Sequence, residues 1–166
     1  YVSLTGCLMY LVAEYARKYD PEALTVFIAP SGSKKADGRE NPNVDFVWTF
    51  RELDAVIEGM EIDMAACEDF TPEEHAGHDA HGFAKTGGVF TAVKNMVGDP
   101  ELQGTLIADL NKKNIAALRA YAKTGKCPTR MIEVMACPGG CISGPCACNE
   151  GMAAIRQFDA ELKKKE

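Results

Sequence analysis

Four cysteines lie close together near the end of the chain. Cys137, Cys141, Cys146 and Cys148 fall within the segment EVMACPGGCISGPCACNE, residues 133–150. Cysteine thiolates are soft ligands, so a cysteine-dense, glycine-rich segment points to iron–sulfur, zinc or copper(I) binding. The spacings C-x3-C, C-x4-C and C-x-C differ from the paired C-x2-C hooks of zinc ribbons and favour an iron–sulfur loop. The alternative is a set of inert buried thiols or a disulfide knot.

The residues before and between these cysteines predict a strand that ends in a sharp turn. An apolar run from Met131 to Ala136, interrupted by Glu133, has the length and composition of a strand. Pro138, Gly139 and Gly140 follow, and glycine both adopts positive φ and leaves room for a bulky group beside the main chain. We therefore expect a loop that presents soft ligands at the end of a strand.

Helical and strand patterns alternate along the rest of the chain. Apolar residues at helical spacing predict helices over residues 8–19, 111–124 and 151–162. A continuous apolar run predicts a strand over residues 24–29, and alternating residues predict one over residues 44–48. This alternation predicts an α/β fold, with a parallel or mixed sheet flanked by helices. We expect the strand at residues 24–29 to be buried, and residues 30–35 to form a loop at its carboxyl end, where such folds place ligands.

Two helix starts have recognisable local signals. Thr49 and Glu52 form a capping box, and Leu53, Val56 and Ile57 are expected to make the buried face of the helix that follows. A second helical pattern within residues 83–97 begins at Gly87-Gly88, whose free amides can approach an anionic group.

Composition and charge narrow the class of protein. The 166 residues carry a net charge of −6, which argues against a nucleic-acid partner. No apolar run is long enough to span a membrane. Seven cysteines, an odd number, fit a reducing compartment with metal-bound thiols, so we expect a cytoplasmic protein. Since residue 1 is Tyr, we also expect the chain to be a fragment that is incomplete at its N-terminus.

Other candidate ligands are weaker. His75, His78 and His81 are spaced by three and suit zinc or nickel, although a solvated loop accounts for the same letters. Cys67 is expected to be a small buried side chain. The sequence assigns no role to Cys127.

The segment from Met135 to Cys141, MACPGGC followed by Ile-Ser-Gly, resembles the third signature of the FeFe (iron-only) hydrogenases. The resemblance implies an H-cluster, in which a 4Fe-4S cubane is joined through one cysteine to a di-iron subsite. It assigns Cys137 as a cubane ligand, Cys141 as the ligand that bridges cubane and di-iron subsite, and Met135 as a neighbour of the di-iron subsite. Gly139 and Gly140 would lie against the cofactor.

Further segments resemble the same family in the same order. FIAPSGSKK is similar to the second signature, which assigns Lys34 to a cyanide ligand of the di-iron subsite and places Ser31 where the family has a cubane-binding cysteine. VDFVWTFREL and FAKTGGV also match, so the resemblance covers nearly the whole chain. The family's first signature would precede residue 1, which leaves Cys7 as an ordinary residue at a helix start. The alternative alignment places Thr5-Gly6-Cys7 in that signature, with Cys7 as a ligand. Residues 1–166 would then form one H-cluster domain of the two-lobed hydrogenase fold, similar to the sensory and monomeric branches.

The resemblance implies reversible oxidation of molecular hydrogen, with a ferredoxin-like electron carrier and hydrogenase maturation proteins as partners. The alternative is a non-catalytic 4Fe-4S sensor or electron-transfer module derived from the same fold, which Ser31 favours because a serine hydroxyl is a poor iron ligand. Cys146 and Cys148 are close enough in sequence to Cys141 to complete a four-thiolate cluster. A zinc-binding structural domain is the third hypothesis.

Overall fold

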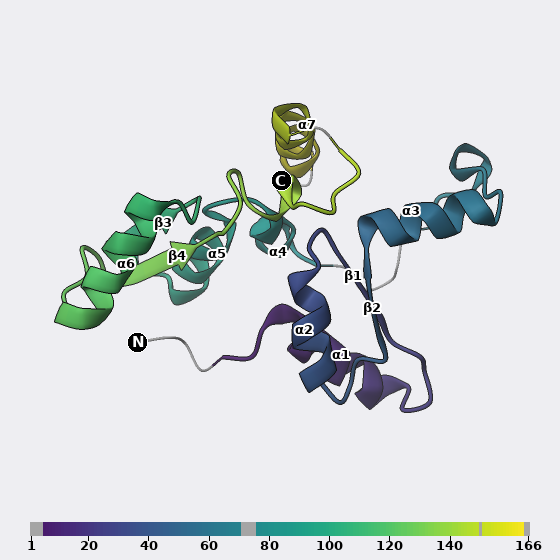
Figure 1. Ribbon diagram of the computed structural model, residues 1–166, viewed down its shortest axis with the longest axis horizontal. Coiled ribbons are helices and arrows are strands. Elements are labelled where there is room, and N and C mark those ends of the chain that lie inside the picture. The colour runs from purple at the N-terminus through teal and green to yellow at the C-terminus, as the bar shows by residue number, and fades with distance from the viewer. Residues whose placement is uncertain (1–4, 71–75, 150, 165–166) are drawn as a thin grey trace. The chain divides into compact units, whose positions relative to one another are not determined.

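The computed structural model describes residues 5–70, 76–149 and 151–164, and the chain divides into two compact units (Figure 1). Each unit combines helices with one pair of parallel strands, which confirms the predicted α/β class. Unit 1 comprises residues 1–67 and 145–148, and unit 2 comprises residues 68–144 and 149–166. Assignment of residues 1–166 to one hydrogenase domain stays a prediction.

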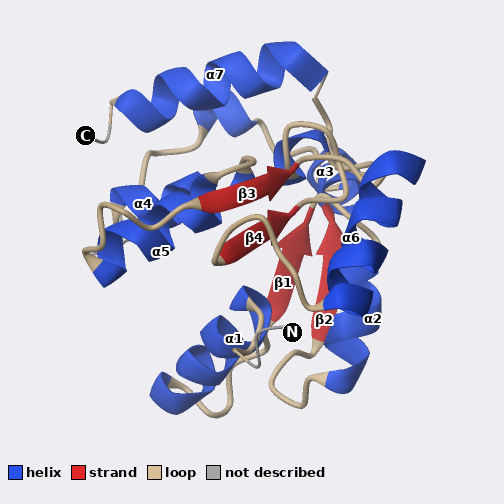
Figure 2. Cartoon of the chain, turned by 90° about the vertical axis from the view of Figure 1, so that its left-hand side faces the viewer, coloured by secondary structure: helices blue, strands red, loops and turns tan. Residues whose placement is uncertain are grey.

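Unit 1 alternates helices and strands. Its elements are α1 (Leu8–Tyr19), β1 (Val26–Ala29), α2 (Ser33–Glu40), β2 (Phe46–Thr49), α3 (Phe50–Gly59) and a 3-10 turn, η1 (Met64–Ala66). Strands β1 and β2 run in parallel, with Val26 opposite Phe46 and Ala29 opposite Thr49 (Figure 2). Helices α2 and α3 both pack against β2.

Unit 2 repeats the pattern around a second strand pair. Its elements are α4 (His78–His81), η2 (Gly82–Ala84), α5 (Gly88–Val97), β3 (Gly104–Ile107), α6 (Lys112–Thr124), β4 (Met131–Val134), η3 (Cys141–Ser143) and α7 (Gly151–Lys163). Strands β3 and β4 lie side by side in parallel, with Gly104 opposite Met131 and Ile107 opposite Val134 (Figure 2). Helix α5 packs against β4.

Helix α2 and strand β3 are among the elements that the sequence did not predict. Helix α2 begins at Ser33, inside the predicted loop at residues 30–35, because its sequence SKKADGRE carries no apolar periodicity that would reveal a helix. Strand β3 has only four residues, GTLI, and is too short to stand out as an apolar run. None of the described helices is both long and apolar enough to cross a bilayer.

Burial differs from the expected pattern in unit 1. The strand predicted over residues 24–29 is shorter, and within it only Ala29 is buried, while Leu24 is 76% exposed. The expected buried face of α3 is only half-buried at Leu53 and Ile57, and Val56 is exposed. A pair of four-residue strands offers little surface for helices to cover, so apolar runs there do not become a closed core.

The capping box at the start of α3 is present as predicted. Thr49 Oγ1 accepts the Glu52 N–H at 3.2 Å, and Glu52 Oε2 accepts the Thr49 N–H at 2.7 Å. Lys35 Nζ of α2 donates to Glu52 Oε1 at 2.6 Å. These hydrogen bonds lower the pKa of Glu52 from its ordinary value of 4.5 to about 2. The bond from the Lys35 ammonium has the largest effect, and those from the Thr49 amide and hydroxyl come next.

This pKa shift predicts an acid-sensitive contribution to stability. Because the folded-state pKa of Glu52 is lowered, the contribution is present above pH 4.5 and is lost as the pH falls toward about 2. In Glu52→Gln, we expect the free energy of unfolding in urea to fall less between about pH 6 and about pH 3 than in the wild type. The control Glu58→Gln removes one carboxylate from the same helix outside the cap. Equal pH dependence in wild type and Glu52→Gln would contradict the prediction.

Candidate functional site

The predicted cysteine loop follows strand β4 in unit 2. The Met135 N–H donates to the Ile107 carbonyl oxygen at 2.7 Å, and the Leu110 N–H donates to the Ala136 carbonyl oxygen at 3.3 Å, so the chain stays beside β3 after β4 ends. The Gly140 N–H donates to the Cys137 carbonyl oxygen at 3.0 Å and closes a turn. Turn η3 begins at Cys141. Cys137 and Cys141 therefore flank one hydrogen-bonded turn, as the sequence predicted.

The two glycines in this turn adopt the predicted positive φ, +82° at Gly139 and +94° at Gly140. Protein atoms occupy the space beside both Cα atoms, and the predicted contact of Gly139 and Gly140 with a bulky cofactor stays a prediction. A Cβ on Gly139 would lie 2.5 Å from Ile155 Cδ1 of α7. A Cβ on Gly140 would lie 2.7 Å from the Ala84 carbonyl oxygen and 2.8 Å from the Thr86 nitrogen. Close packing of the turn against these segments thus requires both glycines.

Residues 84–86 also bind the backbone of the turn between Cys137 and Cys141. Lys85 and Gly140 form an isolated antiparallel bridge, and the Thr86 N–H donates to the Gly139 carbonyl oxygen at 3.4 Å. The Lys85 ammonium also pairs with Asp159 of α7 at 2.6 Å. The cysteine turn is therefore joined to the segment that leads into α5.

The buried side chain of Glu133 links strand β4 to the start of α5. It is 6% exposed, and its two carboxylate oxygens accept the Gly87 N–H at 2.6 Å and the Phe90 N–H at 2.7 Å. The amides at Gly87-Gly88 were predicted to approach an anionic group, and the group that the Gly87 N–H meets is the chain's own Glu133 carboxylate. A single acidic residue inside an apolar strand was the signal for such a contact, since buried carboxylates need hydrogen-bond donors.

The thiols of the loop suit metal binding, although the described residues contain no complete metal site. None of the seven cysteines forms a disulfide, which excludes the disulfide knot in this structure. Cys137 is half-buried and Cys141 is exposed. Within the described ranges, no three His, Cys, Asp or Glu side chains are grouped closely enough to hold a metal ion. The turn thus offers two soft ligands, and the further ligands of a cluster have to come from other residues.

An unpaired hydroxyl beside the turn supports the fit to a cofactor. Thr86 Oγ1 is buried and has no hydrogen-bond partner among the described residues. Such groups are uncommon in folded proteins. A sulfur-bearing cofactor held at this turn would supply an acceptor. The sequence analysis noted the segment that contains Thr86 only because it resembles the hydrogenase family. No pattern in the sequence indicated a role for the Thr86 hydroxyl itself.

Ser31 and Lys34 lie in unit 1, at the start of α2. The Ser31 hydroxyl bonds to the Ser33 hydroxyl at 2.9 Å and accepts the Ser33 N–H at 3.2 Å. Lys34 Nζ donates to Asp37 Oδ2 at 2.7 Å, one turn further along the helix. Lys34 is therefore a helical residue rather than a loop residue. The predicted cofactor roles of Ser31 and Lys34 stay predictions.

Cys146 and Cys148 also belong to unit 1. The Cys146 N–H donates to the Pro30 carbonyl oxygen at 2.9 Å, which joins the C-x-C segment to the residue directly before Ser31. Cys146 is half-buried and Cys148 is exposed. Their metal-binding role stays a prediction.

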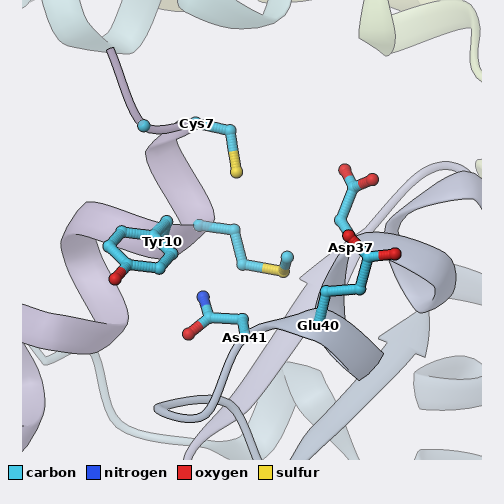
Figure 3. A pocket seen from close by; sticks show the side chains of 7 residues that line it. Cys7, Tyr10, Asp37, Glu40 and Asn41 are labelled. Carbon is cyan, nitrogen blue, oxygen red and sulfur yellow. The ribbon is translucent and has the colours of Figure 1, made fainter. Parts of the chain in front are cut away.

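Cys7 is exposed and lies at the start of α1, as expected for a residue that begins a helix. It lines an open pocket of about 410 Å³ in unit 1 with Asp37, Glu40 and Asn41 (Figure 3). The Asn41 side chain is buried, and its Nδ2 has no hydrogen-bond partner among the described residues. This pocket lacks the three grouped ligands that a metal ion needs, at least within the part of the chain that the structure describes.

The remaining candidate ligands differ from expectation. Cys67 is exposed, so its expected burial is wrong, because the segment after α3 has few apolar neighbours to cover it. Cys127 is exposed as well. His78 and His81 lie in the short helix α4 rather than in a loop, and His75 falls outside the described residues.

Comparison with known proteins gives one family. A family model described as "Iron only hydrogenase large subunit, C-terminal domain" matches residues 1–145. The chain is 29% identical to the "Periplasmic [Fe] hydrogenase large subunit" of Nitratidesulfovibrio vulgaris, over 86% of this chain and 43% of that protein. It is 33% identical to the "NADP-reducing hydrogenase subunit HndD" of Solidesulfovibrio fructosivorans, over 75% of this chain and 26% of that protein. The chain spans less than half the length of both relatives. The cytoplasmic location stays a prediction.

The contact of Glu133 predicts a stability loss that can be measured. In Glu133→Gln, one oxygen is replaced by an amide group that faces a backbone N–H, so one buried donor loses its acceptor. We expect the free energy of unfolding in urea to fall by about 2 kcal/mol. The exposed control Glu101→Gln, also in unit 2, should change it by less than about 0.5 kcal/mol. Unchanged stability in Glu133→Gln would show that the carboxylate does not hold β4 to α5.

Proposed function

The chain belongs to the family formed by the C-terminal domains of iron only hydrogenase large subunits, and from this premise we propose that it is an iron–sulfur protein acting in the reversible oxidation of molecular hydrogen. Cys137 and Cys141 hold a 4Fe-4S cluster in this proposal, with Cys141 also bound to a di-iron H-cluster subsite. Electrons pass to a ferredoxin-like carrier. The whole protein's activity is inferred from relatives that are longer than this chain.

The observation that carries the proposal is the turn between Cys137 and Cys141. Both thiols flank one hydrogen-bonded turn, neither forms a disulfide, and the turn is attached to β3, α7 and residues 84–86. A rigid turn positions ligands before the metal arrives, so less ordering entropy is lost on binding. This favours a bound cofactor over inert thiols.

The cofactor implied by the family supplies, when bound, the site where hydrogen is split or formed and the route for its electrons. The chain's own residues bind and orient that cofactor. Cys137 and Cys141 bind iron, and Met135, which is half-buried beside them in the chain, packs as an apolar neighbour. Gly139 and Gly140 contribute by allowing the tight turn.

Lys34 is proposed to donate its ammonium to an anionic ligand of the cofactor. Its present ion pair with Asp37 joins two side chains that are 36% and 45% exposed. Such solvent-exposed pairs contribute little to stability, so the ammonium can exchange partners at small cost. Ser31 is the residue that departs from the family's pattern, since a hydroxyl replaces the expected thiol.

The second candidate function is a non-catalytic 4Fe-4S sensor or electron-transfer module. The Ser31 hydroxyl favours it, because its bonds to Ser33 stabilise the start of α2 and leave it poorly suited to become an iron ligand. In this case Cys146 and Cys148 are the thiols proposed to complete the cluster.

Removing one thiol of the turn tests both iron–sulfur functions. In Cys141→Ala, we expect iron bound after anaerobic reconstitution with iron and sulfide to fall to the background level, because a cluster loses a required ligand. Cys127→Ala is the matched control, since it removes an exposed thiol of the same unit outside the turn. Iron content is measured by elemental analysis and absorbance. Unchanged iron in Cys141→Ala would exclude both functions.

Infrared spectroscopy separates the remaining possibilities. After reconstitution, the chain is incubated with hydrogenase maturation proteins, which insert the di-iron subsite in this family. Bands of bound carbon monoxide and cyanide support the hydrogenase function. A cubane signal without these bands supports the sensor or electron-transfer module, and bound zinc without iron supports a structural zinc domain.

A further inference from the structure

The side-chain hydroxyl of Thr86 is buried and forms no hydrogen bond with any described residue. Thr86 lies directly before Gly87, the N-cap residue of α5, so its hydroxyl is not at the position from which threonine caps a helix by accepting a backbone N–H. That role is already filled here, because Glu133 accepts the Gly87 and Phe90 amides at the start of α5. The Thr86 hydroxyl is therefore available as a donor.

The backbone of Thr86 is held against the turn that links Cys137 and Cys141. Its N–H donates to the Gly139 carbonyl oxygen at 3.4 Å, and the preceding residue, Lys85, is bridged to Gly140. A Cβ on Gly140 would lie 2.8 Å from the Thr86 nitrogen. The backbone of Thr86 is thus held directly against the residues between the two cysteines.

The chemistry of the thiols changes when they bind iron. A cysteine thiol is a weak hydrogen-bond acceptor, whereas an iron-bound cysteine is a thiolate and carries negative charge. Hydroxyl donors bond more strongly to charged acceptors than to neutral ones. The unused hydroxyl of Thr86, whose backbone is bonded to the turn between the two cysteines, therefore suits the metal-bound form of the thiols better than the metal-free form.

We propose that Thr86 is a positioning residue that donates its hydroxyl to a sulfur of the cluster held by Cys137 and Cys141. The inference rests on the proposed function and adds a specific role to this chain's own residue. Hydrogen bonds to the sulfurs of iron–sulfur clusters tune the reduction potential, because they stabilise the more negatively charged, reduced state. The Thr86 hydroxyl should accordingly raise the potential of the cluster.

The test compares isosteric variants of the reconstituted full chain. Thr86→Val removes the hydroxyl and keeps the shape, and Thr86→Ser keeps a hydroxyl. Thr91→Val is the matched control, because the Thr91 hydroxyl donates to the Gly87 carbonyl oxygen at 2.8 Å at the start of the same helix. Iron and sulfide per chain are measured first, followed by the midpoint potential in a redox titration monitored by electron paramagnetic resonance.

We expect Thr86→Val to bind the wild-type amount of iron with a more negative midpoint potential. Thr86→Ser and Thr91→Val should keep the wild-type potential. Thr86→Ala serves as a second variant without the hydroxyl. If Thr86→Val and Thr86→Ala both fold but lose the cluster, while Thr86→Ser keeps it, this result also supports the role of the hydroxyl.

Two results would overturn the inference. One is a fully loaded Thr86→Val with the wild-type potential, and the other is loss of the cluster from Thr86→Ser together with Thr86→Val. If the wild-type chain itself binds no cluster while it is folded by circular dichroism, the proposed function fails and the role of Thr86 fails with it.

Discussion

A buried carboxylate that joins a strand to a helix start is the interaction on which the candidate site depends. Glu133 lies in β4, and its two oxygens accept amides at the beginning of α5. Burial of a carboxylate is costly unless donors replace water, and here two backbone N–H groups and the positive end of the helix dipole do so. Strand β4 and helix α5 are thereby held together immediately before the cysteine turn begins.

The position of the turn between Cys137 and Cys141 depends on this contact between Glu133 and α5. Residues 84–86 precede α5 and bind the backbone at Gly139 and Gly140, while the continuation of β4 stays bonded beside β3. Tight packing explains the two glycines without reference to any bound group. The same packing fixes the backbone between Cys137 and Cys141, and thiols carried on a fixed backbone suit a metal cofactor.

Local signals in the sequence predicted local structure well. The bounds of α1 and the capping box at Thr49 follow from apolar spacing and from residues whose backbone preferences are strong. Elements without such signals were missed, as α2 and β3 show. Burial was overestimated at Leu24 and Val56 because exposure depends on which surfaces meet, and periodicity does not contain that information.

The site was predictable to a similar degree. The sequence identified the thiols, the turn and an anion at the Gly87 amides, but it did not identify that anion as Glu133, because a local pattern does not show which distant residue becomes the partner. The family match covers residues 1–145, the range that contains the cysteine turn.

X-ray absorption at the iron edge tests the central claim most directly, because it reports the atoms bound to iron in the reconstituted wild-type chain. The account predicts a first shell of sulfur and a second shell of iron, as a cluster held by thiolates gives. A first shell of oxygen and nitrogen alone, without an iron neighbour, would contradict it.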